Sequence, residues 1–127
     1  TTGRPRRCGW LDMVALKYAV RVNGMSSIAL TKLDVLTGFE KIKICTHYEV
    51  NGEKHENYLT NTSLLAKASP VYTTLDGWKE DISGCRDFEK LPEAARRYVE
   101  YIEKETGVPV QLIGVGPGRS QTILRGL

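Results

Sequence analysis

The first long apolar segment of the chain predicts a buried helix. Across residues 10–22, apolar side chains cover nearly the whole circumference of a helix, and a narrow polar face consists of Lys17 and Arg21, four residues apart. The following Asn23-Gly24 predicts the end of this helix. A helix that is apolar almost all round is typical of the interior of a larger body.

A second helix is predicted at residues 92–106. Pro92 suits the first helical position and Gly107 suits the position just past the end. The spacing of the apolar residues predicts one buried stripe, with charged residues on the opposite face. The stripe consists of Ala95, Tyr98, Val99 and Ile102.

The remaining apolar and alternating runs predict strands, at residues 27–31, 41–50, 53–59, 70–75, 110–113 and 120–124. The short run 27–31 is typical of a buried parallel strand. Asn51-Gly52 predicts a type I′ turn between two strands of a hairpin. Alternation in the longest run places Ile42, Ile44, Tyr48 and Val50 on one face. The order of elements predicts an α/β fold, a mixed sheet with flanking helices.

Length, charge and composition narrow the classes of function. The chain has 127 residues, enough for one domain with a core, and we treat 1–127 as a single domain. The net charge of +3 is small, and Arg4, Arg6 and Arg7 cluster at one end. This favours a local anion site over a nucleic-acid surface. Because no membrane-spanning run or secretory signal is visible, a cytoplasmic protein is expected.

The cysteines and histidines do not predict a metal site. Cys8, Cys45 and Cys85 are widely spaced, and zinc sites need close pairs of ligands. We expect reduced thiols rather than a disulfide framework. His47 and His55 flank the predicted hairpin, where solvated strand residues are the simpler interpretation.

The first twelve residues, TTGRPRRCGWLD, carry the densest polar chemistry of the chain. Guanidinium groups bind carboxylates and phosphates through paired hydrogen bonds, so a compact set of arginines suits a small anion with several charged groups. Gly3 frees the backbone of this segment, and Pro5 fixes it. A solvated basic arm is the alternative interpretation.

Lys32-Leu33-Asp34 follows the predicted strand 27–31, and ligands in open α/β sheets bind beyond the carboxyl ends of strands. Guanine presents an N1–H beside a 2-amino group, and the Asp34 carboxylate can accept from both. Adenine lacks this donor pair, so such a site discriminates between the bases. The stem of Lys32 can lie along the base with its ammonium in water. A solvated turn is the alternative.

A glycine-rich segment, Gly114-Val115-Gly116-Pro117-Gly118-Arg119, follows the predicted strand 110–113. Its glycines permit close approach of the backbone to a flat or charged ligand. An ordinary turn between strands uses the same residue types.

Together these segments resemble adenylosuccinate synthetase, a family of GTP-dependent ligases that join aspartate to inosine monophosphate (IMP). The family pattern A-T-T-G-R-x-R-R-x-G-W-x-D is matched by residues 1–12, without the first small residue. T-K-L-D resembles the N-K-x-D signature of GTP-binding proteins. P-V-Y-x-T-L-x-G-W at 70–78 and G-P-G-R-S-Q-T-I at 116–123 extend the resemblance nearly end to end. Gly114 stands where many family members have Ser.

The resemblance implies that GTP phosphorylates the 6-oxygen of IMP and that the aspartate amine then displaces this phosphate. It assigns aspartate and IMP to Thr1, Thr2, Gly3, Arg4, Pro5 and Arg6, with Arg4 also approaching the nucleotide. It assigns GTP to Arg6, Lys32, Leu33, Asp34, Gly114, Val115, Gly116 and Pro117.

In this family the catalytic base and acid, the phosphate loop and the Mg²⁺ ligands belong to N-terminal motifs that nothing in this sequence matches. We therefore expect no catalytic residue and no metal ligand here. The chain is expected to be the C-terminal part of a larger nucleotide-binding fold related to P-loop proteins, and to be inactive alone. The complete enzyme would be a cytoplasmic homodimer of AMP biosynthesis that uses GTP and Mg²⁺.

Two other functions stay open. The first is a non-catalytic anion- or RNA-binding module that uses the basic N-terminal segment, although aromatic stacking residues are not interleaved with its arginines. The second is a regulatory GTP-binding protein, for which no phosphate-binding motif is visible in the sequence.

Overall fold

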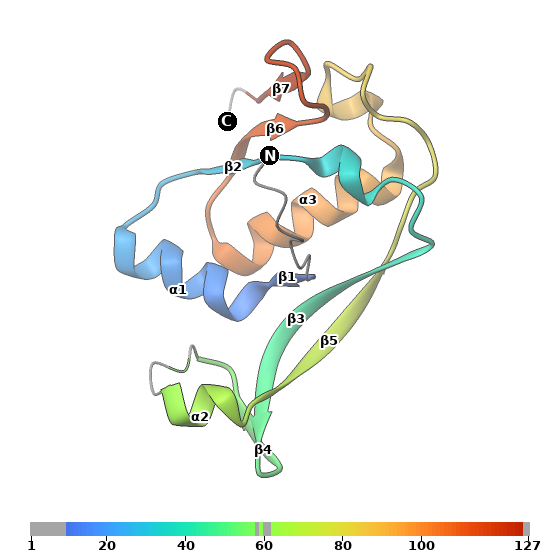
Figure 1. The fold of residues 1–127 in the computed structure, drawn as a ribbon. Coiled ribbons are helices and arrows are strands. Elements are labelled where there is room, and N and C mark those ends of the chain that lie inside the picture. The colour runs from blue at the N-terminus through green and yellow to red at the C-terminus, as the bar shows by residue number, and fades with distance from the viewer. Residues whose placement is uncertain (1–9, 58, 60–61, 126–127) are drawn as a thin grey trace, which may run out of the picture.

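The computed structural model describes residues 10–57, 59 and 62–125, and Figure 1 shows their arrangement. One sheet is built around β3 (Lys41–Val50), which pairs antiparallel with β5 (Ser69–Asp76) along most of its length. β1 (Leu11–Asp12) pairs parallel with β3, and β4 (Glu53–His55) pairs antiparallel with its end. In Figure 1, β3 and β5 form a long ribbon that reaches away from the body, with α2 (Thr62–Ala66) near its far end.

The second sheet has β6 (Val110–Gly114) at its centre. β2 (Ile28–Leu30) pairs with β6 in parallel, and β7 (Thr122–Leu124) pairs with it antiparallel. The apolar run 27–31 is thus a parallel strand, as its composition predicted. The predicted mixed α/β fold is confirmed, with its strands divided between two mixed sheets.

Two long helices pack between these sheets, α1 (Met13–Asn23) and α3 (Glu93–Thr106). Each ends at a glycine in the left-handed conformation, Gly24 and Gly107. The predicted stripe of α3 is buried in full. No helix of the described segments has the length and apolar character needed to cross a bilayer.

The first helix differs from its prediction at its start and in its burial. It begins at Met13 because Leu11 and Asp12 pair with Ile44 and Cys45 of β3. Only part of its apolar surface is buried, and the side chain of Val22 is 60% exposed. The apolar composition of this helix therefore predicted more burial than the described residues provide.

A β-bulge in β3 divides the core into two clusters. Cys45 lies opposite Tyr72 and His47 lies opposite Val71, so one residue between them has no cross-strand partner. An extra residue reverses the alternation of side chains. Ile42 and Ile44 therefore belong to the main core, and the far half of the strand packs into a second cluster. That cluster consists of Val14, Cys45, Tyr48, Val50 and Leu59.

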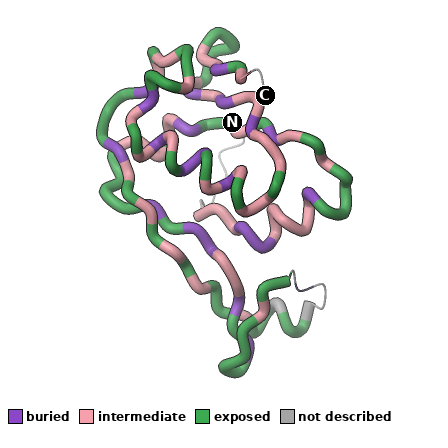
Figure 2. The backbone as a smooth tube through the Cα atoms, turned by 180° about the vertical axis from the view of Figure 1, so that it is seen from behind, coloured by how far each residue is buried: buried purple, intermediate pink, exposed green. Residues whose placement is uncertain are grey.

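The prediction that Ile42, Ile44, Tyr48 and Val50 share a face is therefore wrong beyond the bulge. Figure 2 shows buried stretches both in the body around the helices and along the long ribbon, whose far end is mostly exposed. The predicted type I′ turn is consistent with the backbone, because Asn51 and Gly52 both have positive φ, 52° and 82°. The return strand is shorter than predicted and ends at His55.

Candidate functional site

The C-terminal ends of β2 and β6 lie next to each other at one edge of the second sheet. The strands are parallel, with Leu30 opposite Ile113, so the residues that follow them leave the sheet side by side. A Cβ atom at Gly114 would lie 3.4 Å from the backbone nitrogen of Lys32. Lys32 and Gly114 therefore meet beyond the strand ends, where open α/β sheets bind ligands.

Lys32 and Asp34 stand on either side of a buried anchor, Leu33, which is 1% exposed. Lys32 is in the left-handed conformation, with φ of 59°, and its carbonyl accepts from the backbone N–H of Val35 at 3.1 Å. This turn opens the short helix η1 (Leu33–Leu36). A non-glycine residue at positive φ is uncommon and persists where its surroundings fix it. The turn thus presents an exposed cation and a half-buried carboxylate at the edge of the sheet.

The glycine-rich segment after β6 is folded back on itself. The backbone N–H of Val115 donates to the carbonyl of Gln121 at 2.9 Å, and the N–H of Gln121 donates to the carbonyl of Gly118 at 3.0 Å. The side chain of Val115 is fully buried in the main core. These contacts fix both ends of the turn, while Pro117 and Gly118 between them are exposed.

An apolar cavity of about 340 Å³ adjoins the Lys32 turn. Its walls include Trp10, Leu30, Leu33 and Tyr98, and Lys32 lines it as well. The ring of Trp10 lies edge-on to Phe39, with centroids 5.3 Å apart. Flat apolar walls beside a few polar groups are typical of small-molecule sites. Trp10 directly follows the arginine-rich segment, so the chain enters the described structure beside Lys32.

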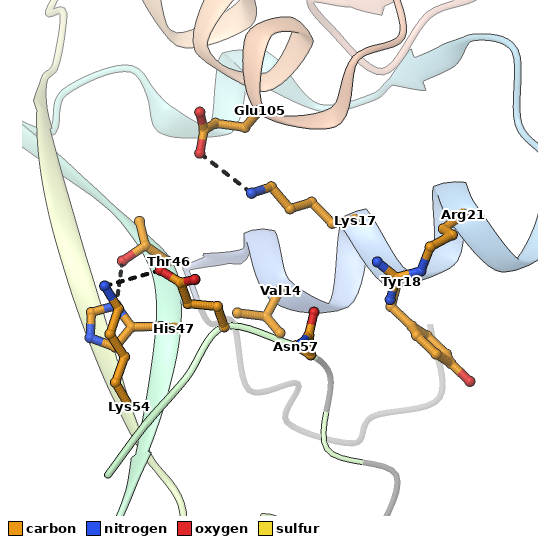
Figure 3. Close-up of a pocket in the computed structure, with 10 residues that line it drawn as sticks. Val14, Lys17, Tyr18, Arg21, Thr46, His47, Lys54, Asn57 and Glu105 are labelled. Carbon is orange, nitrogen blue, oxygen red and sulfur yellow. Dashed lines mark hydrogen bonds and ion pairs between the residues drawn. The ribbon is translucent and has the colours of Figure 1, made fainter. Parts of the chain in front are cut away.

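A second, polar cavity of about 440 Å³ lies between α1 and the β3–β4 hairpin (Figure 3). Lys17 pairs with Glu105 at 3.6 Å, and Lys54 pairs with Glu56 at 3.0 Å. The hydrogen bond and charge of Lys54 lower the pKa of the Glu56 carboxyl, and His47 adds to this effect. Both lysines therefore have carboxylate partners, and no binding residue predicted in the described segments lines this cavity.

Cys45 is a poor candidate for chemistry. Cys45 is buried in the second cluster, and its burial raises the pKa of the thiol, with the charge of Asp12 adding to the effect. A raised pKa keeps a thiol protonated and therefore unreactive. Within the described residues, no three or more His, Cys, Asp or Glu side chains are grouped so as to hold a metal ion.

The structure describes some of the predicted site residues and not others. Those assigned to aspartate and IMP, from Thr1 to Arg6, lie outside the described residues. Of those assigned to GTP within the described segments, Lys32 and Gly114 lie together, and the others follow them directly in the sequence. Leu33 is buried, and it contributes to the wall of the apolar cavity beside Lys32. Trp10 and Tyr98 were not predicted at the site, since their helix-like spacing indicated only core positions.

The comparisons with known proteins agree on one family. The family model for adenylosuccinate synthetase matches residues 1–123. Curated adenylosuccinate synthetases from Pelotomaculum thermopropionicum and Alkaliphilus metalliredigens are 57% and 50% identical to this chain, over 98% of its length. The chain spans 29% of the length of each.

A solved structure of fully ligated adenylosuccinate synthetase from Plasmodium falciparum is 44% identical, with a TM-score of 0.92 over 98% of this chain and 30% of that one. Agreement of sequence and fold over nearly all of the chain leads to one conclusion. The chain belongs to the adenylosuccinate synthetase family.

Proposed function

We propose that this chain supplies the guanine-recognition surface and the aspartate-binding loop of a GTP-dependent ligase that forms adenylosuccinate from IMP and aspartate. The main support is the contact between Lys32 and Gly114 at paired strand ends, in a chain of this family. The ligase would be longer than this chain, because the chain spans 29% of the length of its curated relative from Alkaliphilus metalliredigens. A homodimeric, cytoplasmic enzyme is part of the proposal.

Guanine recognition follows from the Lys32 turn. The Asp34 carboxylate accepts hydrogen bonds from the N1–H and the 2-amino group of guanine. The stem of Lys32 covers one face of the base, and the backbone of Gly114, Val115, Gly116 and Pro117 closes over it. The half-buried position of Asp34 supports this assignment, since a carboxylate shielded from water discriminates more strongly between donors and acceptors.

The arginine-rich segment is assigned to the carboxylates of aspartate, with Arg4 also approaching IMP and Arg6 reaching GTP. Trp10 lines the cavity that Lys32 also lines. Arg4 lies six positions before Trp10 in the sequence, and six extended residues span at most about 20 Å. This short connection supports assigning Arg4 to the same site.

Phosphoryl transfer to IMP and its displacement by the aspartate amine need a base, an acid and Mg²⁺. No group of possible metal ligands exists among the described residues, so we assign no Mg²⁺ ligand and no catalytic step to them. The proposed role of the described site residues is to bind and orient GTP. Binding of this kind contributes to catalysis by fixing the reacting groups in position.

Replacing Asp34 by Asn tests the guanine contact in the full-length ligase. We expect the KM for GTP to rise by roughly a hundredfold, because the charged acceptor for two donors is lost. Xanthosine triphosphate should become the better substrate, since its C2 carbonyl accepts from the new amide. Steady-state kinetics with both nucleotides measure this, with Asp87→Asn on the exposed surface as the control. Unchanged use of GTP would remove Asp34 from the base site.

Replacing Arg4 by Leu tests the proposed aspartate contact. We expect kcat/KM for aspartate to fall by roughly a hundredfold or more, because a charge-assisted pair of hydrogen bonds is lost. Arg97→Leu, at an exposed position of α3, is the control. Normal aspartate kinetics for Arg4→Leu, together with salt-sensitive binding of oligonucleotides, would favour the RNA-binding alternative.

A further inference from the structure

Gln121 lies inside the turn formed by the glycine-rich segment and bonds to it through both backbone and side chain. Its carbonyl accepts from the N–H of Val115, and its N–H donates to the carbonyl of Gly118. Its side-chain oxygen Oε1 accepts from the N–H of Gly118 at 2.9 Å. One residue therefore holds both ends of the segment that is proposed to close over guanine.

The packing of Gln121 against the segment is as close as its hydrogen bonding. A Cβ atom at Gly116 would lie 2.4 Å from the side-chain amide carbon of Gln121, closer than any van der Waals contact allows. The Gln121 amide thus occupies the space that a side chain at Gly116 would need. A side chain at Gly116 would therefore displace the Gln121 amide from its position.

The other end of the Gln121 side chain reaches a separate part of the molecule. Its Nε2 donates to the carbonyl of Ser83 at 3.5 Å, a long hydrogen bond. Ser83 follows Ile82, which is fully buried in the main core. The amide therefore bridges the glycine-rich segment and an anchored loop, so the position of the segment is set from outside as well as from within.

We propose that Gln121 is a positioning residue for GTP, whose side-chain amide sets the conformation in which residues 114–118 meet the guanine base. This rests on the function proposed above and names a residue that needs no contact with the nucleotide. Its loss should weaken GTP binding without altering the chemistry at IMP or aspartate.

The test uses Gln121→Met in the full-length ligase, because Met keeps the length of the side chain and removes both amide hydrogen bonds. We expect the KM for GTP to rise about tenfold, which is the size of effect that one lost hydrogen bond to a fixed loop produces. The kcat and the KM values for IMP and aspartate should stay within about twofold of the parent, as expected when only ground-state binding of one substrate changes. Faster deuterium exchange is expected in the peptide that contains Gly118.

Two further variants separate positioning from general stability. Gln121→Glu keeps an acceptor for the Gly118 N–H and should recover most of the affinity for GTP, to within about threefold of the parent. Val50→Ala, in the second cluster at the far end of β3, should lower stability and leave the KM for GTP unchanged. If Gln121→Met does not fold, Gln121→Asn replaces it, since its shorter side chain cannot reach both partners.

Coupling between Gly116 and Gln121 gives an independent measurement. Gly116→Ala alone should raise the KM for GTP, because its Cβ displaces the Gln121 amide. In a Gln121→Ala background the same change has room, and its effect should be smaller, which is non-additivity between contacting residues. Strict additivity would overturn the proposal.

Comparison with Asp34→Asn separates the positioning role of Gln121 from the proposed function in guanine recognition. If Asp34→Asn weakens GTP binding and Gln121→Met leaves the KM for GTP unchanged, the positioning role is wrong and the proposed function stands. If neither variant affects GTP, both are wrong. A uniform fall of kcat with every KM altered in Gln121→Met would also overturn the positioning role.

Discussion

Gly77 lies where the chain that follows β5 passes closest to the segment before β3. Its N–H donates to the carbonyl of Glu40 at 2.9 Å, and the neighbouring Trp78 carbonyl accepts from Gly38 at 2.9 Å. A Cβ atom at Gly77 would lie 1.8 Å from the carbonyl oxygen of Phe39. In the sequence, the dipeptide Asp76-Gly77 is typical of a turn. In the structure, a glycine is needed at this position because two backbone segments approach each other closely.

We expect Gly77→Ala to lower the free energy of unfolding by about 3 kcal/mol, because the backbone must move apart to admit a methyl group. Urea denaturation measures the change. Gly84→Ala is the matched control, since no atom lies within 4 Å of its Cβ position, and it should change stability by no more than about 0.5 kcal/mol. Equal urea midpoints of unfolding for the two variants would show that the backbone accommodates a methyl group at Gly77 without loss of stability.

At the scale of elements, Asp12 joins β1, α1 and β3. It ends the parallel pairing with β3 and caps α1, accepting from the N–H of Ala15 at 3.1 Å through Oδ1. The hydroxyl of Tyr48 donates to its other oxygen, Oδ2. The sequence predicted Asp12 in the first turn of a longer helix. Its pairing with Cys45 is what moves the start of the helix to Met13.

We expect Asp12→Ala to lower the free energy of unfolding by about 1–2 kcal/mol, because the cap of α1 and the partner of Tyr48 are both lost. Asp12→Asn should cost much less, since an Asn side chain caps a helix almost as well. Urea denaturation followed by circular dichroism measures both. If the Asn variant were as unstable as the Ala variant, the charge of Asp12 would matter more than its cap.

For the molecule as a whole, the main core joins the two sheets and the two long helices, and it contains one ionisable residue, Tyr98, among the side chains described in it. Burial raises the pKa of Tyr98 from 10.0 to about 12. The folded chain therefore keeps this proton at pH values at which the unfolded chain has lost it. The resulting stabilisation is complete below pH 10 and is lost as the pH rises to about 12.

We expect the free energy of unfolding of the parent to fall between pH 10 and pH 12 by on the order of 2 kcal/mol more than that of Tyr98→Phe. Urea denaturation across this range measures the difference. Tyr72→Phe, where the side chain is 42% exposed on β5, is the control and should follow the parent. Parallel curves for Tyr98→Phe and the parent would show that Tyr98 does not titrate with unfolding.

The sequence predicted local structure well where a short-range pattern of residues specifies it. The stripe of α3 and the glycine stops depend on neighbours a few residues away. The strand β2 was also predicted, although only Ile28 of its three residues is buried. The bulge at Thr46 was not predictable, since alternation gives no sign of an extra residue until the partner strand is known. From residue patterns alone the site was predicted as separate segments, and only the resemblance to the family grouped them, because the pairing of β2 with β6 joins residues far apart in the chain.

The amino-acid sequence by itself determined the two long helices and most of the strands, because propensity, periodicity and capping act over short distances. Only the tertiary structure decided that Gly114 meets Lys32, that Gln121 fills the space beneath Gly116, and that Leu33 is a buried anchor. The physical reason is that side-chain packing and strand register depend on contacts between distant residues. These contacts exist only once the chain has folded.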